Sequence, residues 1–144
     1  MKTVFEDIGG KAVIARVAKV FYDLVFQDPW IGQYFADVKQ ETIEAQQTDF
    51  MTQALGGPKV YCGRFPIPAH KHMFISEELF IYRENLVKKA LDEVGIAPQL
   101  QEAWLNIDRA FKNGIVKKSV DQCEKRFNTD EILNFENPKI KKAA

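Results

Sequence analysis

Residues 54–70 read ALGGPKVYCGRFPIPAH, a stretch that combines an abrupt helix end, an ordered loop and the first of the two histidines of the chain. The Gly-Gly-Pro run at 56–58 ends a helix, because glycine adopts the left-handed conformation at helix ends and proline cannot continue the helix. The following residues contain further prolines but a single glycine, so we expect an ordered loop rather than a flexible linker. A brief helical piece at 69–74 should then present His70 and His72.

Apolar residues on both sides of this stretch recur at helical spacing. We expect helices over about 11–28, 41–55, 76–94 and 98–115, a helical turn near 30–35, and two short helices near 120–127 and 130–135. Ser76 is a candidate N-cap of the third long helix, and Gly95 is its C-terminal stop. No segment shows sustained alternation of apolar and polar residues, so the predicted fold class is all-α.

The composition is that of an ordinary globular domain. The chain has 144 residues, of which 46% are hydrophobic and 28% charged, which suits a single core. Its 20 basic and 20 acidic residues give no net charge, so we expect binding neither to nucleic acid nor to a membrane. The first residues lack an apolar signal core, no later run could span a bilayer, and the two cysteines lack metal-binding spacing. We therefore expect a cytoplasmic protein with reduced thiols.

Two polar side chains interrupt the apolar stripes. Gln47 lies four residues after Ile43 and four before Met51, and Tyr22 lies at the edge of the first long stripe. A buried amide must find hydrogen-bond partners or cost roughly 1–3 kcal/mol. Both side chains could reach water or a backbone carbonyl, or both could point into one cavity and donate hydrogen bonds to a small ligand. The periodicity alone leaves both alternatives open.

The histidines allow two interpretations as well. A lone histidine on a short helix can simply be a surface residue. His70 and His72 are only two residues apart and have no further ligands at zinc spacing, so a conventional zinc site is not expected. A cofactor that brings four ligands of its own needs just one histidine.

The sequence resembles the truncated haemoglobins, and their first group in particular, over about residues 4–116. The resemblance is carried, in fixed order, by Phe5 with Ile8-Gly9-Gly10, Val20-Phe21-Tyr22 with Asp28, Tyr34-Phe35-Ala36, Gln47 with Phe50, Ala54-Leu55-Gly56-Gly57-Pro58, Tyr61, Gly63-Arg64 and Ala69-His70.

This resemblance implies a truncated globin, a two-over-two helical sandwich around non-covalently bound haem b, with a C-terminal helical extension. We expect a globin domain at 1–118 and the extension at 119–144. By position, His70 is the expected proximal ligand of the haem iron, and Tyr22 and Gln47 are the expected distal side chains that stabilise a bound ligand. Ile43 occupies the position of the distal histidine of classical globins and is expected to form an apolar gate.

The resemblance also implies a set of cofactor-binding residues, with no catalytic residue beyond the haem iron. They are Phe35, Gln46, Phe50, Met51, Tyr61, Arg64, Phe65, Phe74, Phe80 and Ile107, of which Tyr61 and Arg64 are candidates for the haem propionates. Certain relatives carry an iron-binding histidine where this chain has Gln46, and covalent haem attachment needs a histidine that the last helices lack. His72 is expected at the surface or at the haem edge. Arg83 stands where the family often has an apolar residue.

The implied function is reversible binding of oxygen, nitric oxide or carbon monoxide. Oxidation of nitric oxide to nitrate is one activity that this binding could serve, and it requires an external reductase. The alternative is a haem-based gas sensor or redox partner that signals through the C-terminal extension. A haem-free helical interaction module is a third hypothesis.

Overall fold

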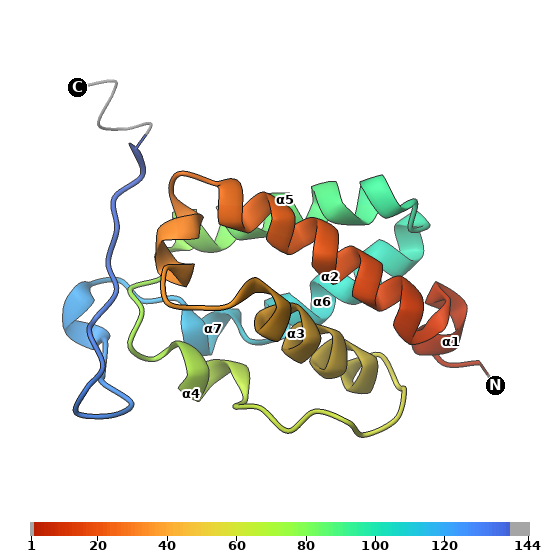
Figure 1. The fold of residues 1–144 in the computed structure, drawn as a ribbon, viewed down its shortest axis with the longest axis horizontal. Coiled ribbons are helices and arrows are strands. Elements are labelled where there is room, and N and C mark those ends of the chain that lie inside the picture. Colours follow the sequence, from red (N-terminus) through yellow and green to blue (C-terminus); the bar gives the residue numbers. More distant parts are fainter. Residues whose placement is uncertain (1, 139–144) are drawn as a thin grey trace.

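The computed structural model describes residues 2–138, and helices make up most of this part of the chain (Figure 1). The α-helices are α1 (Val4–Ile8), α2 (Gly10–Gln27), α3 (Gln40–Ala54), α4 (Pro66–His70), α5 (Glu77–Val94), α6 (Pro98–Ala110) and α7 (Lys112–Ile115), with 3₁₀ turns η1 (Ile31–Phe35) and η2 (Val120–Gln122). The described residues form no strand, and only one isolated bridge joins Met73 to Leu133. The predicted all-α class is confirmed.

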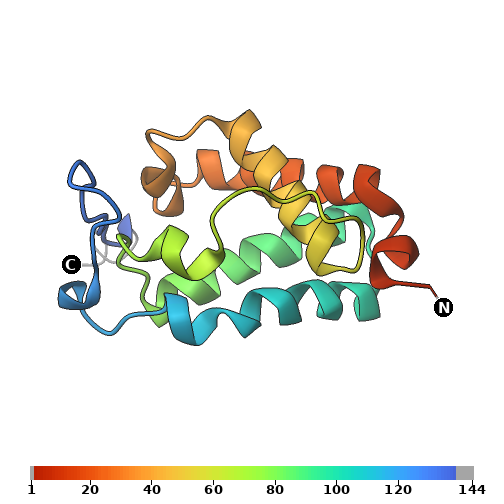
Figure 2. The ribbon, with the colours of Figure 1, turned by 90° about the horizontal axis from the view of Figure 1, so that it is seen from below.

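The four long helices form two pairs. In Figure 2, α5 and α6 lie side by side, and α3 crosses α2 on the other side of the molecule. The loop after α3 and the short helix α4 lie beside this crossing, between α3 and the end of α7. In this two-over-two arrangement, α4 contacts α7.

Local chemistry explains where these helices begin and end. The Ser76 hydroxyl accepts a hydrogen bond from the Leu79 amide at 3.1 Å, which caps α5 as predicted. Gly95 ends the same helix in the left-handed conformation at φ 86°, where a residue with a Cβ would be strained. Asp28 ends α2, and its carboxylate accepts from the amides of Trp30 and Ile31, both at 2.9 Å. This turn directs η1 back across the end of the core.

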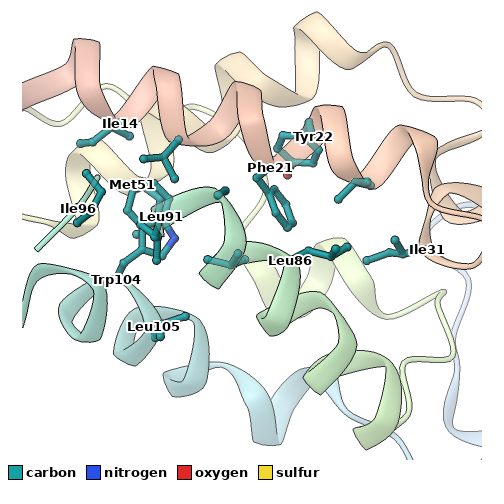
Figure 3. Packing of buried hydrophobic residues seen from close by; sticks show 14 of the residues in the cluster. Ile14, Phe21, Tyr22, Ile31, Met51, Leu86, Leu91, Ile96, Trp104 and Leu105 are labelled. Atoms are coloured by element: carbon teal, nitrogen blue, oxygen red, sulfur yellow. The ribbon is translucent and has the colours of Figure 1, made fainter. Parts of the chain in front are cut away.

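The core is continuous along α2. At one end, Ile14, Met51, Leu91 and Trp104 pack together from four different helices, and all are at most 2% exposed (Figure 3). Further along α2, Phe21 and Tyr22 lie side by side opposite α5. Burial of a large apolar side chain stabilises a fold by roughly 1.5–3 kcal/mol. The packing of the four residues at the first end therefore holds the helix pairs together. Phe21 and Tyr22 lie in a separate part of the core.

The chain after α7 differs from the sequence prediction. The expected helix near 130–135 is wrong, and the one near 120–127 is reduced to the single turn η2. The Leu133 amide donates to the His72 carbonyl at 3.0 Å, and the Leu133 carbonyl accepts from the Phe74 amide at 2.7 Å. These backbone groups pair with a neighbouring segment, so they are not available for helical bonds. The predicted extension also includes residues 139–144, which lie outside the described residues.

This C-terminal segment, residues 116–137, lies at the end of the molecule opposite the N-terminus (Figure 1). The predicted helix at 98–115 is split into α6 and α7, and the predicted helical piece at 69–74 begins earlier and ends at His70. Within the part of the chain that the structure describes, none of the helices is both long and apolar enough to cross a bilayer.

Candidate functional site

His70 ends the short helix α4, and its ring is held by the same helix. Its Nδ1 lies 2.5 Å from the Pro66 carbonyl oxygen. A carbonyl can only accept, so Nδ1 carries the proton and Nε2 keeps a free lone pair. Burial, opposed by this hydrogen bond, lowers the pKa of His70 to about 4, so the ring is neutral at pH 7. The arrangement presents one oriented imidazole nitrogen that makes no other hydrogen bond to the described residues.

Tyr22 approaches the site from α2 and is almost fully buried. Its ring makes edge-to-face contacts with Phe21, Phe26 and Phe35 at centroid distances of 4.8, 6.4 and 5.9 Å. Burial raises the pKa of Tyr22 to about 12, so the hydroxyl stays protonated and can donate a hydrogen bond. Three aromatic rings fix the orientation of this donor.

Helix α3 faces Tyr22 with mixed polarity. Its Glu44 carboxylate raises the pKa of Tyr22, so this part of α3 lies within electrostatic reach of the phenol. Ile43 is half-buried against the core, Gln47 is half-buried, and Gln46 is exposed. No side-chain hydrogen bond joins Gln47 of α3 to Tyr22 or to any other described residue. The two predicted distal donors are therefore near one region but are not paired with each other.

The predicted aromatic lining is divided between several places. Phe35 lies against Tyr22, whereas Phe50 packs edge-to-face on Tyr61 at 5.2 Å, and Tyr61 lies 6.5 Å from Phe65. The Tyr61 hydroxyl donates to the Arg64 carbonyl. Phe65 itself is 64% exposed. Phe50 of α3 thus begins an aromatic row that continues through Tyr61 and Phe65 along the loop between α3 and α4.

Other predicted lining residues lie in the core or farther away. Met51 is completely buried, Phe80 is buried, and Ile107 packs partly buried against the core. Phe74 lies along the C-terminal segment and helps to line a pocket of about 410 Å³ there. The exposed Arg64 guanidinium lies 4.6 Å from the centre of the Phe127 ring. Haem contacts of these residues stay predictions.

An ion pair within electrostatic reach of Tyr22 and His70 joins α5 to α6. The Arg83 Nη1 atom of α5 donates to Asp108 Oδ2 of α6 at 3.1 Å, and the two side chains are 28% and 11% exposed. The guanidinium carbon is 5.0 Å from the centre of the Phe21 ring. Burial lowers the pKa of Arg83, but Asp108 and then Tyr22 outweigh it and raise the pKa above its usual value. The positive charge of Arg83 in turn lowers the pKa of His70 further. It also offsets part of the rise that burial causes in the pKa of Tyr22.

Comparison with known proteins identifies the architecture around this site. The sequence profile of the family described as bacterial-like globin matches residues 3–117. The chain belongs to the bacterial-like globin family. Among globins of known sequence, a group 1 truncated haemoglobin of Tetrahymena thermophila is 37% identical over 99 residues, covering 68% of this chain and 81% of that protein. The group 1 truncated haemoglobin GlbN of a Synechocystis strain is 34% identical over 105 residues, covering 69% and 84%.

The solved globins agree with this assignment. The truncated haemoglobin of Tetrahymena pyriformis in its Fe(III) form superposes with a TM-score of 0.75 at 26% identity, covering 81% of this chain and 100% of that structure. The predicted resemblance to truncated haemoglobins and the two-over-two fold are thus confirmed. The C-terminal segment lies almost wholly beyond residues 3–117, which the family profile matches.

The globin family implies a haem, and the residues of this chain fit one. A haem iron takes four nitrogens from the porphyrin and needs one axial base from the protein. His70 offers such a base, because its Nδ1 is already bonded to Pro66 and its Nε2 is free. The neutral imidazole and the protonated Tyr22 phenol come from different helices of one region. Among the described residues, no group of three His, Cys, Asp or Glu side chains could hold a bare metal ion instead.

Two residues of this region cannot be assigned from the family resemblance, and a third lies elsewhere than expected. The sequence marks Arg83 only as a departure from the family pattern and gives Asp108 no role. A signal was present: Arg83 lies between the buried Phe80 and Val87 on one stripe of α5, and Asp108 lies four residues after the buried Trp104. Charges that interrupt facing stripes of neighbouring helices are expected to pair.

The misplaced residue is His72. It is only 4% exposed, so the expectation of a surface position is wrong. Its Nδ1 is buried without a hydrogen-bond partner in the described part of the chain. The cause is the C-terminal segment, which pairs with the backbone of His72 and covers it.

Proposed function

We propose that this globin binds haem b non-covalently through His70 and takes up oxygen or another diatomic gas at the haem. The observation that carries the proposal is the free, oriented Nε2 of His70, whose tautomer is set by the Pro66 carbonyl. When bound, the haem would supply the iron centre that binds the gas. The protein supplies the axial base, the orientation of that base and the donors around the gas.

The residues of the chain account for the properties of such a site. The Pro66 hydrogen bond holds the imidazole plane and increases the basicity of Nε2. The Tyr22 hydroxyl is buried among aromatic rings, where a donor is stronger than in water, and we assign it to the bound gas. We assign Gln47 as a second donor and Ile43 as an apolar gate beside it. Phe35, packed on Tyr22, excludes water from this side.

Haem retention by His70→Ala tests the axial role. The purified wild-type protein should show the absorption of a histidine-ligated haem. The variant should lose the haem to an acceptor globin at least about tenfold faster, which corresponds to about 1.4 kcal/mol. Because His72 is the other histidine of the chain, His72→Ala is the matched control and should retain haem. Equal retention by all three proteins would contradict the proposal.

Oxygen release tests the distal role. One hydrogen bond to the partly charged oxygen contributes on the order of 1 kcal/mol, so Tyr22→Phe should release oxygen about fivefold faster. Gln47→Leu should have a similar effect, and Gln99→Leu, at an exposed position of α6, is its control. Unchanged release in both Tyr22→Phe and Gln47→Leu would leave the pocket without its proposed donors.

Nitric oxide dioxygenation is the reaction that we propose for the oxygenated protein. With haem held by His70, the site would oxidise nitric oxide with oxygen to nitrate, and an external reductase would supply the one electron that each turnover needs. The chain carries no flavin or nicotinamide motif, so the reductase is a separate cytoplasmic partner in this proposal. Rapid mixing of the oxygenated protein with nitric oxide should convert its spectrum within one turnover, and persistence of that spectrum would exclude the reaction.

The C-terminal segment supports a second candidate function, gas sensing. Its backbone pairs with residues 71–74, immediately after His70, and the Phe135 carbonyl accepts from Trp30 Nε1 at 2.8 Å. A movement of His70 would therefore be transmitted through residues 71–74 to this segment. Deletion of residues 119–144 should change oxygen affinity if the segment relays the ligand state, whereas an inert segment would change only stability.

A further inference from the structure

The Arg83–Asp108 pair is partly buried, with side chains that are 28% and 11% exposed, and the charge of Arg83 acts on both Tyr22 and His70. An arginine carries five N–H donors in a fixed plane. In this structure Asp108 receives only Nη1, and no other described residue accepts from the guanidinium. The remaining donors are thus unassigned, although the side chain is largely removed from water.

A purely structural pair would not need this arrangement. Burial of an ion pair costs several kcal/mol per ion, and apolar residues of similar volume often stabilise a fold at least as well. Asp108 engages one nitrogen in a single bond, whereas a structural Arg–carboxylate pair tends to be bidentate. The face of the guanidinium rests on Phe21, the neighbour of Tyr22, at 5.0 Å from the ring centre. The Phe21 ring and the Asp108 carboxylate together fix the guanidinium and leave its other edge available.

We propose that Arg83, held in place by Asp108, is a specificity-determining residue that makes the ligand pocket favour small anions, such as azide, over neutral diatomic gases. The inference rests on the proposed haem site, because the anion is taken to bind within that pocket. Asp108 is a positioning residue in this scheme. A guanidinium in a region of low dielectric attracts an anion more strongly than the same group in water, and it donates charge-assisted hydrogen bonds.

Electrostatic neighbours define how far this preference extends. The carboxylates of Asp108 and Glu44 and the cation of Arg83 all act on the Tyr22 phenol. Asp108 offsets part of the positive charge, so the preference arises from the short-range hydrogen bonds of Arg83 and not from a broad positive field. It should therefore persist in concentrated salt, which screens exposed charges.

The test compares an anionic with a neutral probe in haem-loaded protein. Azide is titrated into the ferric form, and carbon monoxide into the ferrous form. Arg83→Met should weaken azide binding about tenfold, the equivalent of one charge-assisted hydrogen bond, and change carbon monoxide binding less than about twofold. Arg83→Lys keeps the charge but loses the planar donors, so it should recover only part of the azide affinity. Arg16→Met removes the same charge from an exposed position of α2 and should leave both affinities unchanged.

Further measurements keep the test decisive. Arg83→Met leaves the Asp108 carboxylate unpaired, so the doubly neutral variant R83M/D108N is made as well and should show the same loss for azide. In haem-free protein, the single variants R83M and D108N should each lower the midpoint of urea unfolding, and the double variant should lower it by less than their sum. This result, obtained without haem, would establish that the pair couples energetically.

Two results would overturn the inference. Azide and carbon monoxide affinities that fall together in R83M would assign Arg83 a structural role, and unchanged azide affinity in R83M and R83M/D108N would show that no anion contacts it. In both cases the wild-type protein still holds haem and binds gas, so the proposed function survives. A wild-type chain that retains no haem instead overturns the proposed function, and the inference with it.

Discussion

Lys117 joins the chain after α7 to the loop that follows His70, and its replacement should destabilise this end of the globin. Its ammonium donates to the carbonyls of His70, Met73 and Ile115 at 3.2, 2.9 and 3.2 Å. A hydrogen bond to a charged group contributes roughly 1.5–3 kcal/mol. The His70 carbonyl retains the Met73 amide as a partner at 3.0 Å, and burial, which lowers the pKa of Lys117, opposes part of the gain.

We therefore expect Lys117→Met to lower the free energy of unfolding by roughly 2–3 kcal/mol. For a chain of this size, that loss corresponds to a fall of roughly 5–10 °C in Tm. Urea unfolding and thermal melts of the purified protein measure both quantities. Lys118→Met is the matched control, since Lys118 is exposed. If the two variants unfold within about 0.5 kcal/mol of each other, the triple hydrogen bond does not stabilise the fold, and the reasoning is refuted.

Three further predictions concern stability. Gly57→Ala should lower the free energy of unfolding, measured in urea, by roughly 1–3 kcal/mol. The new Cβ would lie 2.7 Å from both Phe5 Cδ1 and the Thr52 carbonyl oxygen, so an unchanged free energy of unfolding would show that these neighbours move apart without cost. Leu91→Ala should cost roughly 2–5 kcal/mol, since Leu91 is completely buried, and a loss below about 1 kcal/mol would contradict the described core. Burial, together with the hydrogen bond that Tyr82 donates to the Asp28 carboxylate, raises the pKa of Tyr82 from 10.0 to about 12. The phenol of the unfolded chain therefore releases its proton at lower pH than the phenol of the folded protein, and stability is lost as the pH rises between these two values. Alkaline melts should show this decline in the wild type and less of it in Tyr82→Phe, and equal profiles would contradict it.

The long helices could be predicted from the sequence because their signals are local. Apolar spacing, the Ser76 cap and the stops at Gly56 and Gly95 act within a few residues, and the structure reproduces α2, α3 and α5 from them. His70 could be singled out as well, but from the resemblance and not from its surroundings. The Pro66 hydrogen bond that orients its ring follows from the short helix α4, which the sequence placed three residues too late.

The contacts that could not be predicted join residues distant in the sequence. Arg83 meets Asp108 across two helices, 25 positions apart, and Lys117 reaches the His70 carbonyl over 47 positions. Local propensity contains no information about such partners. Residues 130–135 show the same limit, because their pattern permits a helix but the backbone of Leu133 finds stronger partners beside His72. Tertiary pairing decided the structure of that segment.

The C-terminal segment is fastened to the globin largely through main-chain atoms. Leu133 exchanges amide and carbonyl bonds with residues 72 and 74, and the Glu124 amide donates to the Lys71 carbonyl at 2.8 Å. Every amino acid except proline offers the same amide donor. Most side chains between residues 124 and 133 can therefore be replaced in evolution without loss of the backbone hydrogen bonds that hold this segment to the residues that follow His70. Divergent sequence in this stretch is compatible with an unchanged anchoring role.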